Sequence, residues 1–550
     1  MMNRIATTIT LACLAPAAAA DGEILQFQTI NELEGGLGFV LDDDDRFGAA
    51  VDRIGDLDGD GLGDLIVGAP GDDDAGTDEG AAWILFLNAD GSVRERQKVL
   101  PPLASASFGQ AVAQVGDVNL DGTNDVAIAR EGAIEILGLL QSSPPVVINR
   151  ISATDYPGAA FPQNEFGASL ARLSDLNADG YSELAVGEPR LDLGGPDRGA
   201  VHVFDLAPSA GGVVVPLLAT IGTASGGFLG SLGDGDEFGR AIASPGDVDG
   251  DGVADLVVTA PDDDTTGSND GAFWTLFLNP DGTVGSERKL TSLDGAPAAL
   301  FDAIDFGEAL ASLGDFDGAG APDLLMAGED LHVLFLRSDG TVRSFVRHRE
   351  PDVTGLTDGW DAVCATGDHD GDGLPEIVVG APRAETTGDE RGEIHVLFMD
   401  AVQPAAVQSY GCGTGPPGSI DVSDAPYLGG SFEFLVDNPL GTQSPGSLPF
   451  VAVGLDDLAT PCGLPLPGFH MSPLAPNGEL LVADLVVPEL WGAPWTGPGQ
   501  PAAVPAAIPQ DAGLLGLSLF TQGLLFDPSG GPSGAVLFGL TRGLELRIGT

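Results

Sequence analysis

The sequence predicts an all-β protein in which a six-bladed β-propeller is followed by a C-terminal β-sandwich. Six acidic loops recur between residues 56 and 376, short β-rich runs surround each loop, and the composition changes near residue 410. The 550-residue chain contains 81 glycines and 40 prolines and few stretches with a helical period. Many short strands joined by tight turns, repeated at a regular interval, are typical of all-β repeat architectures.

Each acidic loop has oxygen-bearing side chains at alternate positions, a glycine at position 6 and a carboxylate at position 9. The first copy, loop one, runs from Asp56 to Asp64, and loops two to six begin at residues 117, 175, 247, 315 and 368. These starts are 61, 58, 72, 68 and 53 residues apart. The spacing identifies an internal repeat and predicts six structural units of the same kind.

The composition of these loops predicts calcium sites. Acids at positions 1, 3 and 5 converge only if the backbone turns tightly, which the glycine permits, and a carbonyl at position 7 and an acid at position 9 complete an oxygen shell. Without a cation the carboxylates would repel one another and oppose folding. One such loop could be a solvated acidic turn, but six copies in register favour Ca²⁺. The predicted ligands, with position 7 contributing its carbonyl, are Asp56, Asp58, Asp60, Leu62, Asp64, Asp117, Asn119, Asp121, Thr123, Asp125, Asp175, Asn177, Asp179, Tyr181, Glu183, Asp247, Asp249, Asp251, Val253, Asp255, Asp315, Asp317, Asp323, Asp368, Asp370, Asp372, Leu374 and Glu376.

The six loops are not equivalent. Loop four has an acid at every required position, whereas loops two and three have Asn119 and Asn177 at position 3, which still offer an oxygen. Loop five has Ala319 at position 5, so we predict that it binds calcium weakly or not at all. His369 lies inside loop six at a non-ligand position, and we expect it to face solvent.

Two further motifs flank each loop. A Phe-Gly pair precedes it, with Trp360-Asp361 as the exception in the sixth copy, and a short β-rich run and Gly-Ala-Pro or a relative follow it. An apolar third strand, a turn such as Asn88-Ala89-Asp90-Gly91 and a polar outer strand complete the unit. Four short strands per repeat predict one propeller blade. The Phe-Gly pairs begin at Phe47, Phe108, Phe166, Phe238 and Phe306.

The order Phe-Gly, acidic loop, Gly-Ala-Pro resembles the FG-GAP repeat, the unit of the integrin α-subunit β-propeller and of many bacterial secreted proteins. The resemblance covers about residues 45–400 and implies a calcium-binding propeller over residues 21–405. It also implies an extracellular binding or cell-adhesion module for a protein or a glycan. Integrin propellers have seven blades, so seven is the alternative to the six motifs present here. A structural surface or matrix protein that binds only calcium is the competing function.

The two ends of the predicted propeller suggest how the ring closes. Blade six runs into a stretch rich in Pro and Ala, 401–408, without an outer strand of its own. The segment from Ile24 to Ile30 has the pattern of an outer strand and precedes blade one. We predict that this segment pairs with blade six, whereas the alternative is a frayed leader.

Residues 1–20 have the features of a secretory signal peptide. Arg4 precedes an apolar run that ends in Ala18-Ala19-Ala20, and we expect cleavage after Ala20. A lipoprotein signal at Cys13 is the less favoured alternative. No other apolar run is long enough to span a bilayer, so we expect no membrane insertion. The prediction is a secreted protein, extracellular or at the cell surface, where calcium sites of roughly 10⁻⁴ to 10⁻³ M affinity are filled.

The formal net charge of −60 argues against nucleic acid as a partner, because 82 acidic residues outnumber 22 basic ones. Catalytic motifs are also missing from the sequence: it has no nucleophile elbow, no phosphate-binding loop and no paired histidines with metal-ligand spacing. We therefore predict a protein that is not an enzyme. A polysaccharide lyase or hydrolase is the minor alternative.

Residues 410–550 lack acidic loops and contain alternating strand-like runs between Pro/Gly turns, which predicts a β-sandwich. Cys412 and Cys462 lie in this region, and the exported context favours a disulfide between them. Cys364, in the first strand of blade six, is expected to be a small buried side chain. The region serves either as a stability cap or as an interaction domain.

Overall fold

The computed structural model places most of the propeller region and the strands of the C-terminal region. The described residues of the first are 24–103, 106–140, 143–155, 165–207, 215–265, 271–292, 307–353, 359–386 and 388–399. The chain separates into two compact units, one over residues 22–401 and one over 402–549. The predicted signal peptide, Phe306, Cys412 and Cys462 lie outside the described residues. Among the described residues no helix has the length and apolar character needed to cross a bilayer.

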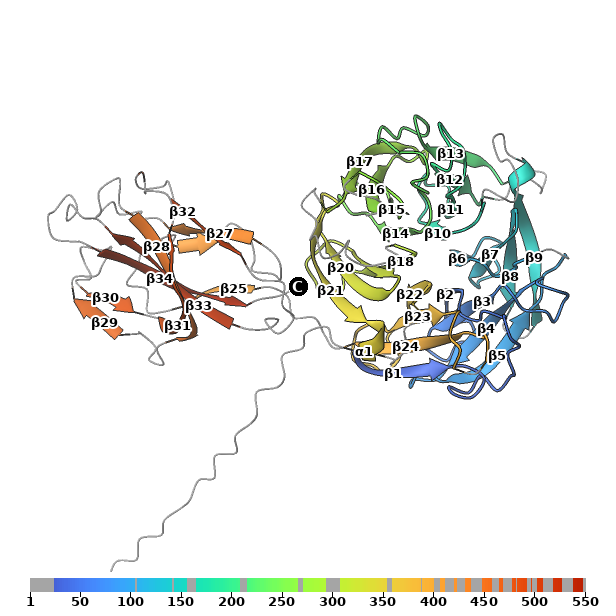
Figure 1. The fold of residues 1–550 in the computed structure, drawn as a ribbon, viewed down its shortest axis with the longest axis horizontal. Coiled ribbons are helices and arrows are strands. Elements are labelled where there is room, and N and C mark those ends of the chain that lie inside the picture. The colour runs from blue at the N-terminus through green and yellow to red at the C-terminus, as the bar shows by residue number, and fades with distance from the viewer. Residues whose placement is uncertain are drawn as a thin grey trace, which may run out of the picture. The chain divides into compact units, whose positions relative to one another are not determined.

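The first unit is a β-propeller of six four-stranded antiparallel sheets (Figure 1). Six blades are therefore present, and the seven-bladed alternative is wrong. The blades are β2 (Ala50–Gly55), β3 (Asp64–Ala69), β4 (Ala81–Leu87) and β5 (Val93–Val99); β6 (Val112–Gly116), β7 (Asp125–Arg130), β8 (Ala133–Leu140) and β9 (Ser143–Ser152); β10 (Leu170–Leu173), β11 (Glu183–Glu188), β12 (Ala200–Asp205) and β13 (Leu217–Gly222); β14 (Ile242–Gly246), β15 (Asp255–Ala260), β16 (Ala272–Leu278) and β17 (Val284–Leu290); β18 (Ala309–Gly314), β19 (Asp323–Ala327), β20 (Asp330–Leu336) and β21 (Val342–Arg349); and β22 (Ala362–Ala365), β23 (Ile377–Ala381), β24 (Glu393–Met399) and β1 (Ile24–Ile30). Two short helices, η1 (Ala153–Asp155) and α1 (Glu350–Val353), complete this unit.

Burial explains why the strands of a blade differ in sequence. The second and third strands pack between neighbouring blades, and every residue of β3 and β4 is buried. They are continuous apolar runs, as strands covered on both faces must be. The outermost strand β5 is buried only at its ends and carries charged residues between them. In blade one the charged strand residues are therefore concentrated at the outer edge.

The ring closes through the N-terminal strand, as predicted. β1 pairs antiparallel with β24, so it becomes the outer strand of blade six (Figure 1). Side chains reinforce the pairing: Thr29 Oγ1 lies 3.0 Å from His395 Nδ1, and Asn31 Nδ2 donates to Glu393 Oε2 at 2.8 Å. Pairing removes an open edge on the third strand of blade six.

The Phe-Gly and Gly-Ala-Pro motifs meet between adjacent blades. A Cβ added to Gly68 would lie 1.9 Å from the carbonyl oxygen of Gly109 in the next blade, and a Cβ on Gly380 would lie 2.0 Å from that of Gly48. Only glycine permits this approach of two backbones. The aromatic member of the motif is buried at each described site, and Trp360 fills this role in the sixth blade. The two motifs are thus halves of one contact.

The C-terminal unit contains three antiparallel sheets. Their orders are β25-β34-β33-β28-β31, β26-β27-β32 and β29-β30. The packing of these sheets into a sandwich stays a prediction. The strands are β25 (Ala406–Tyr410), β26 (Ile420–Val422), β27 (Ser431–Val436), β28 (Leu448–Asp457), β29 (Leu464–Pro467), β30 (Asn477–Leu480), β31 (Val482–Trp491), β32 (Ala502–Ala507), β33 (Ser518–Phe526) and β34 (Phe538–Arg547).

Candidate metal centres on the propeller loops

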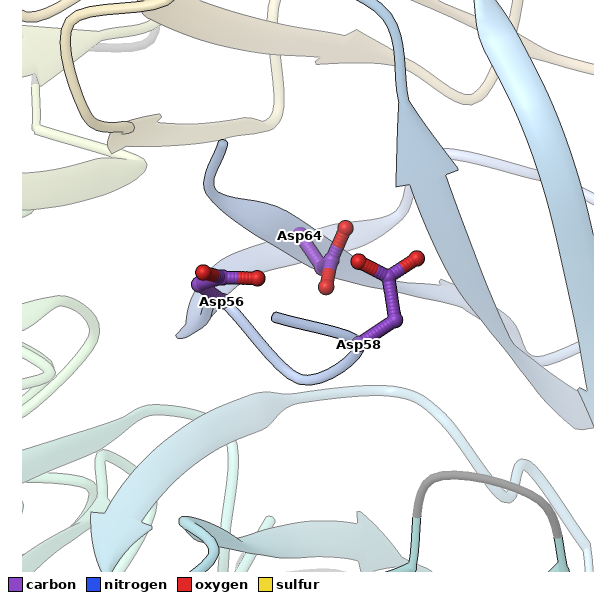
Figure 2. Close-up of side chains that lie close together, drawn as sticks. All are labelled: Asp56, Asp58 and Asp64. Atoms are coloured by element: carbon purple, nitrogen blue, oxygen red, sulfur yellow. The ribbon is translucent and has the colours of Figure 1, made fainter. Parts of the chain in front are cut away.

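All six acidic loops lie at the same end of the propeller. Each connects the innermost strand of a blade to the second strand, as loop one connects β2 to β3. Figure 2 shows that the side chains of Asp56, Asp58 and Asp64 converge in loop one. One carboxylate oxygen from each lies within 4.8 Å of the others. This separation lets the three oxygens contact one ion.

The glycine at position 6 has the predicted role. Its φ angle lies between +93° and +96° in all six loops, as at Gly61 and Gly252, and this is the region that side chains other than glycine disfavour. In every loop its N–H donates to the carboxylate at position 1, at 2.8 to 3.0 Å. The turn thereby holds the first acid in place.

Position 4 also takes a left-handed backbone conformation, which sequence reasoning missed. Four loops have glycine there, but Leu120 and Ala178 adopt φ angles of +61° and +59° in loops two and three. The available signal was the set of glycines at this position in the other four loops, which are Gly59, Gly250, Gly318 and Gly371. They were overlooked because the ligand pattern itself does not require glycine at this position.

The acid at position 9 is the buried anchor of each loop. Its carboxylate accepts a hydrogen bond from the N–H of position 2 in all six copies, at 2.8 to 2.9 Å. It is at most 2% exposed in every loop. The remaining oxygens Asp64 Oδ1 and Glu183 Oε1 are buried and have no hydrogen-bond partner. Such an oxygen is costly unless a cation satisfies it, so the residues present fit a metal ion.

The raised pKa values of the acids at position 9 in loops one to five also fit a bound cation. Burial, followed by repulsion from other acids of the same loop, raises the pKa of Asp64 to about 7. The pKa of Glu183 is raised to about 7 chiefly by burial. Burial also raises the pKa of Asp125 and Asp255 to about 6 and that of Asp323 to about 7. A divalent cation would reverse this penalty by favouring the ionised form.

The structure brings acids together in four of the loops. Three-acid groups with oxygens within 4.8 Å occur in loops one, four, five and six, and loop five keeps its group although Ala319 supplies no oxygen. In loops two and three asparagine occupies position 3, so these loops offer three acids and one amide oxygen. The groups are Asp56, Asp58 and Asp64; Asp247, Asp249 and Asp251; Asp315, Asp317 and Asp323; and Asp368, Asp370 and Glu376.

His369 does not face solvent, which corrects the sequence-based expectation. It is 4% exposed, with Nδ1 2.9 Å from Glu376 Oε2 and Nε2 2.9 Å from the carbonyl oxygen of Gly63. Burial by itself would lower the pKa of His369, but these acceptors outweigh it and raise the pKa. Gly63 belongs to blade one, so His369 links the two blades that meet where the ring closes.

A central channel of about 720 Å³ is lined by the innermost strands. Equivalent positions of the six strands contribute an apolar ring to its lining, and polar residues line it as well. There Arg172 Nη1 donates to Gln114 Oε1 at 3.0 Å, and Asp52 accepts from the N–H of Gln114 at 2.7 Å. Cys364, as predicted, is buried and is a free thiol. The apolar ring consists of Val51, Val112, Leu170, Ile242, Leu310 and Val363.

Comparison with known families agrees with this geometry. The FG-GAP repeat profile matches residues 47–85, 166–204 and 238–276, and the profile of an FG-GAP-like repeat matches residues 315–379. The ring is an integrin-α-like FG-GAP propeller. The FG-GAP matches fall on blades one, three and four. Blade two, which no profile matches, has Ala129-Arg130-Glu131 in place of Gly-Ala-Pro.

Several integrin α subunits are similar to this propeller in sequence. Integrin alpha-4 from Xenopus laevis is 35% identical over 150 residues, which cover 26% of this chain and 14% of that protein. Integrin alpha-PS5 from Drosophila melanogaster is 34% identical over 176 residues, 30% of this chain and 16% of the relative. Integrin alpha-5 from Xenopus laevis is 26% identical over 338 residues, 57% of this chain and 29% of the relative. The matched segments are thus less than a third of the length of these relatives.

Among solved structures, a crystal structure of BBS1N in complex with ARL6DN, soaked with lead, gives a TM-score of 0.34 at 11% identity. The match covers 69% of this chain and 98% of that one. This likeness is too weak to support a functional argument.

Proposed function

We propose that the protein is an exported, calcium-stabilised propeller that acts as a non-enzymatic binding module for an extracellular protein or glycan. The observation that carries the proposal is the repeated loop. A left-handed glycine, a clamped acid at position 1 and a buried acid at position 9 recur in all six blades. The similarity to integrin α subunits supports a binding role, and the predicted signal peptide supports secretion or display at the cell surface.

Calcium is the cation that the ligand set favours. The loops offer carboxylate, amide and carbonyl oxygens but no thiolate, and such hard oxygen ligands select Ca²⁺ or Mg²⁺ over softer metals. Flexible loops with five or more oxygens suit the larger Ca²⁺, since Mg²⁺ demands a strict octahedron. Ions bound at one end of each blade would fix the turn between its first two strands.

Calcium binding is tested by titrating the chelator-treated full-length protein with Ca²⁺ and, separately, with Mg²⁺. We expect several Ca²⁺ ions per chain and weak binding of Mg²⁺. Asp247→Asn should remove one Ca²⁺ ion, whereas Glu131→Gln, which neutralises an exposed acid outside the loops, should not change the number bound. A chain that binds no Ca²⁺ would refute the calcium part of the proposal.

The binding role is tested by screening the secreted chain against arrays of extracellular proteins and glycans, with Ca²⁺ and with chelator. A saturable ligand whose binding needs Ca²⁺ would support a binding module. Absence of binding on both arrays would instead favour a structural protein that binds only calcium. Product release from an acidic polysaccharide would contradict the non-enzymatic assignment.

A further inference from the structure

Each blade has a β-bulge in its outermost strand. The register between the third and fourth strands shifts at equivalent positions in blades one, four, five and six, and two residues earlier along the third strand in blades two and three. A bulge leaves one residue unpaired and re-aims its side chain. The bulge residues of blades one to six are Arg94, Ile148, Leu218, Gly285, Arg343 and Leu25.

The bulge directs its side chain toward the acidic loop of the same blade. Arg94 forms ion pairs with Asp58 and Asp60 of loop one, and Arg343 pairs with Asp317 of loop five. In blade two, a Cβ atom added to Gly138 would lie 2.9 Å from Asn119 Nδ2 and 3.1 Å from Ile148 Cδ1. The side chains of the loop residue Asn119 and the bulge residue Ile148 thus both approach Gly138. Blades one and five, whose bulges are at equivalent positions, therefore show that a long side chain at the bulge contacts the acids of the loop.

Loop five combines two features that occur together in no other loop. It lacks the acid at position 5, where it has Ala319, and it faces an arginine. The carboxylate of Asp317 is 1% exposed and the Arg343 side chain is 14% exposed, and the guanidinium also lies 5.7 Å from the centroid of the Phe335 ring. Position 3 is fully buried only in this loop. The charge pair is thus held inside the blade, where a partner of opposite sign is required.

Loop four shows the opposite combination. Its four acids are complete, and the bulge residue is Gly285, which has no side chain to reach the loop. Asp249 and Asp251 remain exposed. This loop, with a complete set of acids, therefore leaves open the place that a guanidinium fills in blade five.

We propose that the bulge residue decides which loops take calcium, and that Arg343 replaces the ion in blade five. The guanidinium supplies the positive charge that the acids of loop five need, so the loop is stabilised without a metal ion. Arg94 has a weaker form of the same role: its loop keeps four acids, and the side chain is 37% exposed, so Ca²⁺ competes with it for Asp58 and Asp60. This inference rests on the proposed calcium binding of the other loops.

The test is to exchange the cation of blade five. Arg343→Leu alone should lower the melting temperature in chelator and should not add a calcium ion, because position 5 still lacks an acid. Ala319→Asp combined with Arg343→Leu should bind one Ca²⁺ ion more than the wild-type chain, measured by equilibrium dialysis of the full-length protein. Arg349→Leu, which removes an exposed charge from the same strand, is the matched control and should change neither quantity.

Two further variants keep the test decisive if the exchanged protein does not fold. Arg343→Lys should retain most of the stability in chelator that Arg343→Leu loses, since it keeps the positive charge. Arg94→Leu should raise the calcium affinity of one site severalfold without changing the number of ions bound.

The results separate the inference from the proposed function. If the wild-type chain binds no Ca²⁺, the calcium proposal fails. The effect of Arg343→Leu on stability in chelator still tests whether Arg343 stabilises loop five. If the wild-type chain binds six ions and Arg343→Leu behaves like Arg349→Leu, the inference is wrong and calcium binding stands.

Discussion

Blades four and five have the same strands and the same loop backbone, yet they handle the charge of their loops differently. In both, the glycine N–H at position 6 clamps the first acid and the position 9 acid is buried. Blade four presents Asp249 and Asp251 to solvent opposite a glycine, whereas blade five buries Asp317 against Arg343. Under the proposed calcium binding, an ion in blade four and the side chain of Arg343 in blade five supply the positive charge that the acids of each loop need.

Opening the ring should produce the largest effect and should affect both blades alike. Deletion of residues 21–31 removes β1 and exposes the edge of β24, so we expect a large loss of thermal stability, loss of a single cooperative transition and aggregation. Calorimetry and sedimentation check this, with deletion of residues 21–23 as the control. A truncated chain that melts like the intact one and stays monomeric would contradict the closing role of β1.

Removal of calcium should separate the two blades. Each site contributes RT ln(1 + [L]/Kd) to the stability of the folded state, about 1.4 kcal/mol at tenfold excess of Ca²⁺ over Kd. Chelator should therefore lower the melting temperature of the chain and collapse hydrogen-exchange protection at 247–255 more than at 315–323. Equal protection of both loops in chelator would remove the proposed difference.

Substitution of the first acid sharpens the comparison in terms of bound ions. Asp247→Ala should cost about one Ca²⁺ ion per chain, because it removes a ligand from a complete set. Asp315→Ala should cost none. Equilibrium dialysis at saturating Ca²⁺ measures both, and an equal loss would mean that loop five binds an ion despite Ala319.

The pH dependence of the metal-free protein should be a smaller effect. Burial raises the pKa of Asp255 to about 6 and of Asp323 to about 7, so the folded state holds protons that the unfolded state releases. Stability in chelator should then fall as pH rises from about 4 to 7, by about 1.4 kcal/mol for each unit by which a pKa is raised. Chemical denaturation at pH 5 and pH 7.5 tests this. Saturating Ca²⁺ should weaken or reverse the trend, and stability that rises with pH in chelator would contradict it.

The features that could be predicted from the sequence are those that follow a repeated local pattern. Six spaced motifs are enough to place six blades, and the pattern of Ile24–Ile30 is enough to place the closing strand, because both depend on local periodicity. The acids at positions 1, 3 and 9 were found for the same reason. Each acid has a fixed spacing from the glycine at position 6, and the tight turn at that glycine explains the spacing.

Contacts that cross from one strand or blade to another were not predictable in this way. The position of Arg343 beside Asp317 depends on a bulge, which shifts the register by one residue without a sequence signature of its own. The burial of His369 depends on Gly63, 306 residues away in sequence. Leu120 shows a third limit, since surrounding hydrogen bonds hold a branched residue in a conformation that sequence rules assign to glycine.

The closing strand also sets an order of events during synthesis. The partner of β1, strand β24, follows it by more than 300 residues; Thr29 and His395, which meet in the finished ring, are 366 residues apart. Until residue 399 has been made, β1 lacks its partner and the ring cannot close. A nascent chain therefore carries an unpaired β1 while the intervening five blades are made, and this interval is when a chaperone that shields exposed strands has the most to offer.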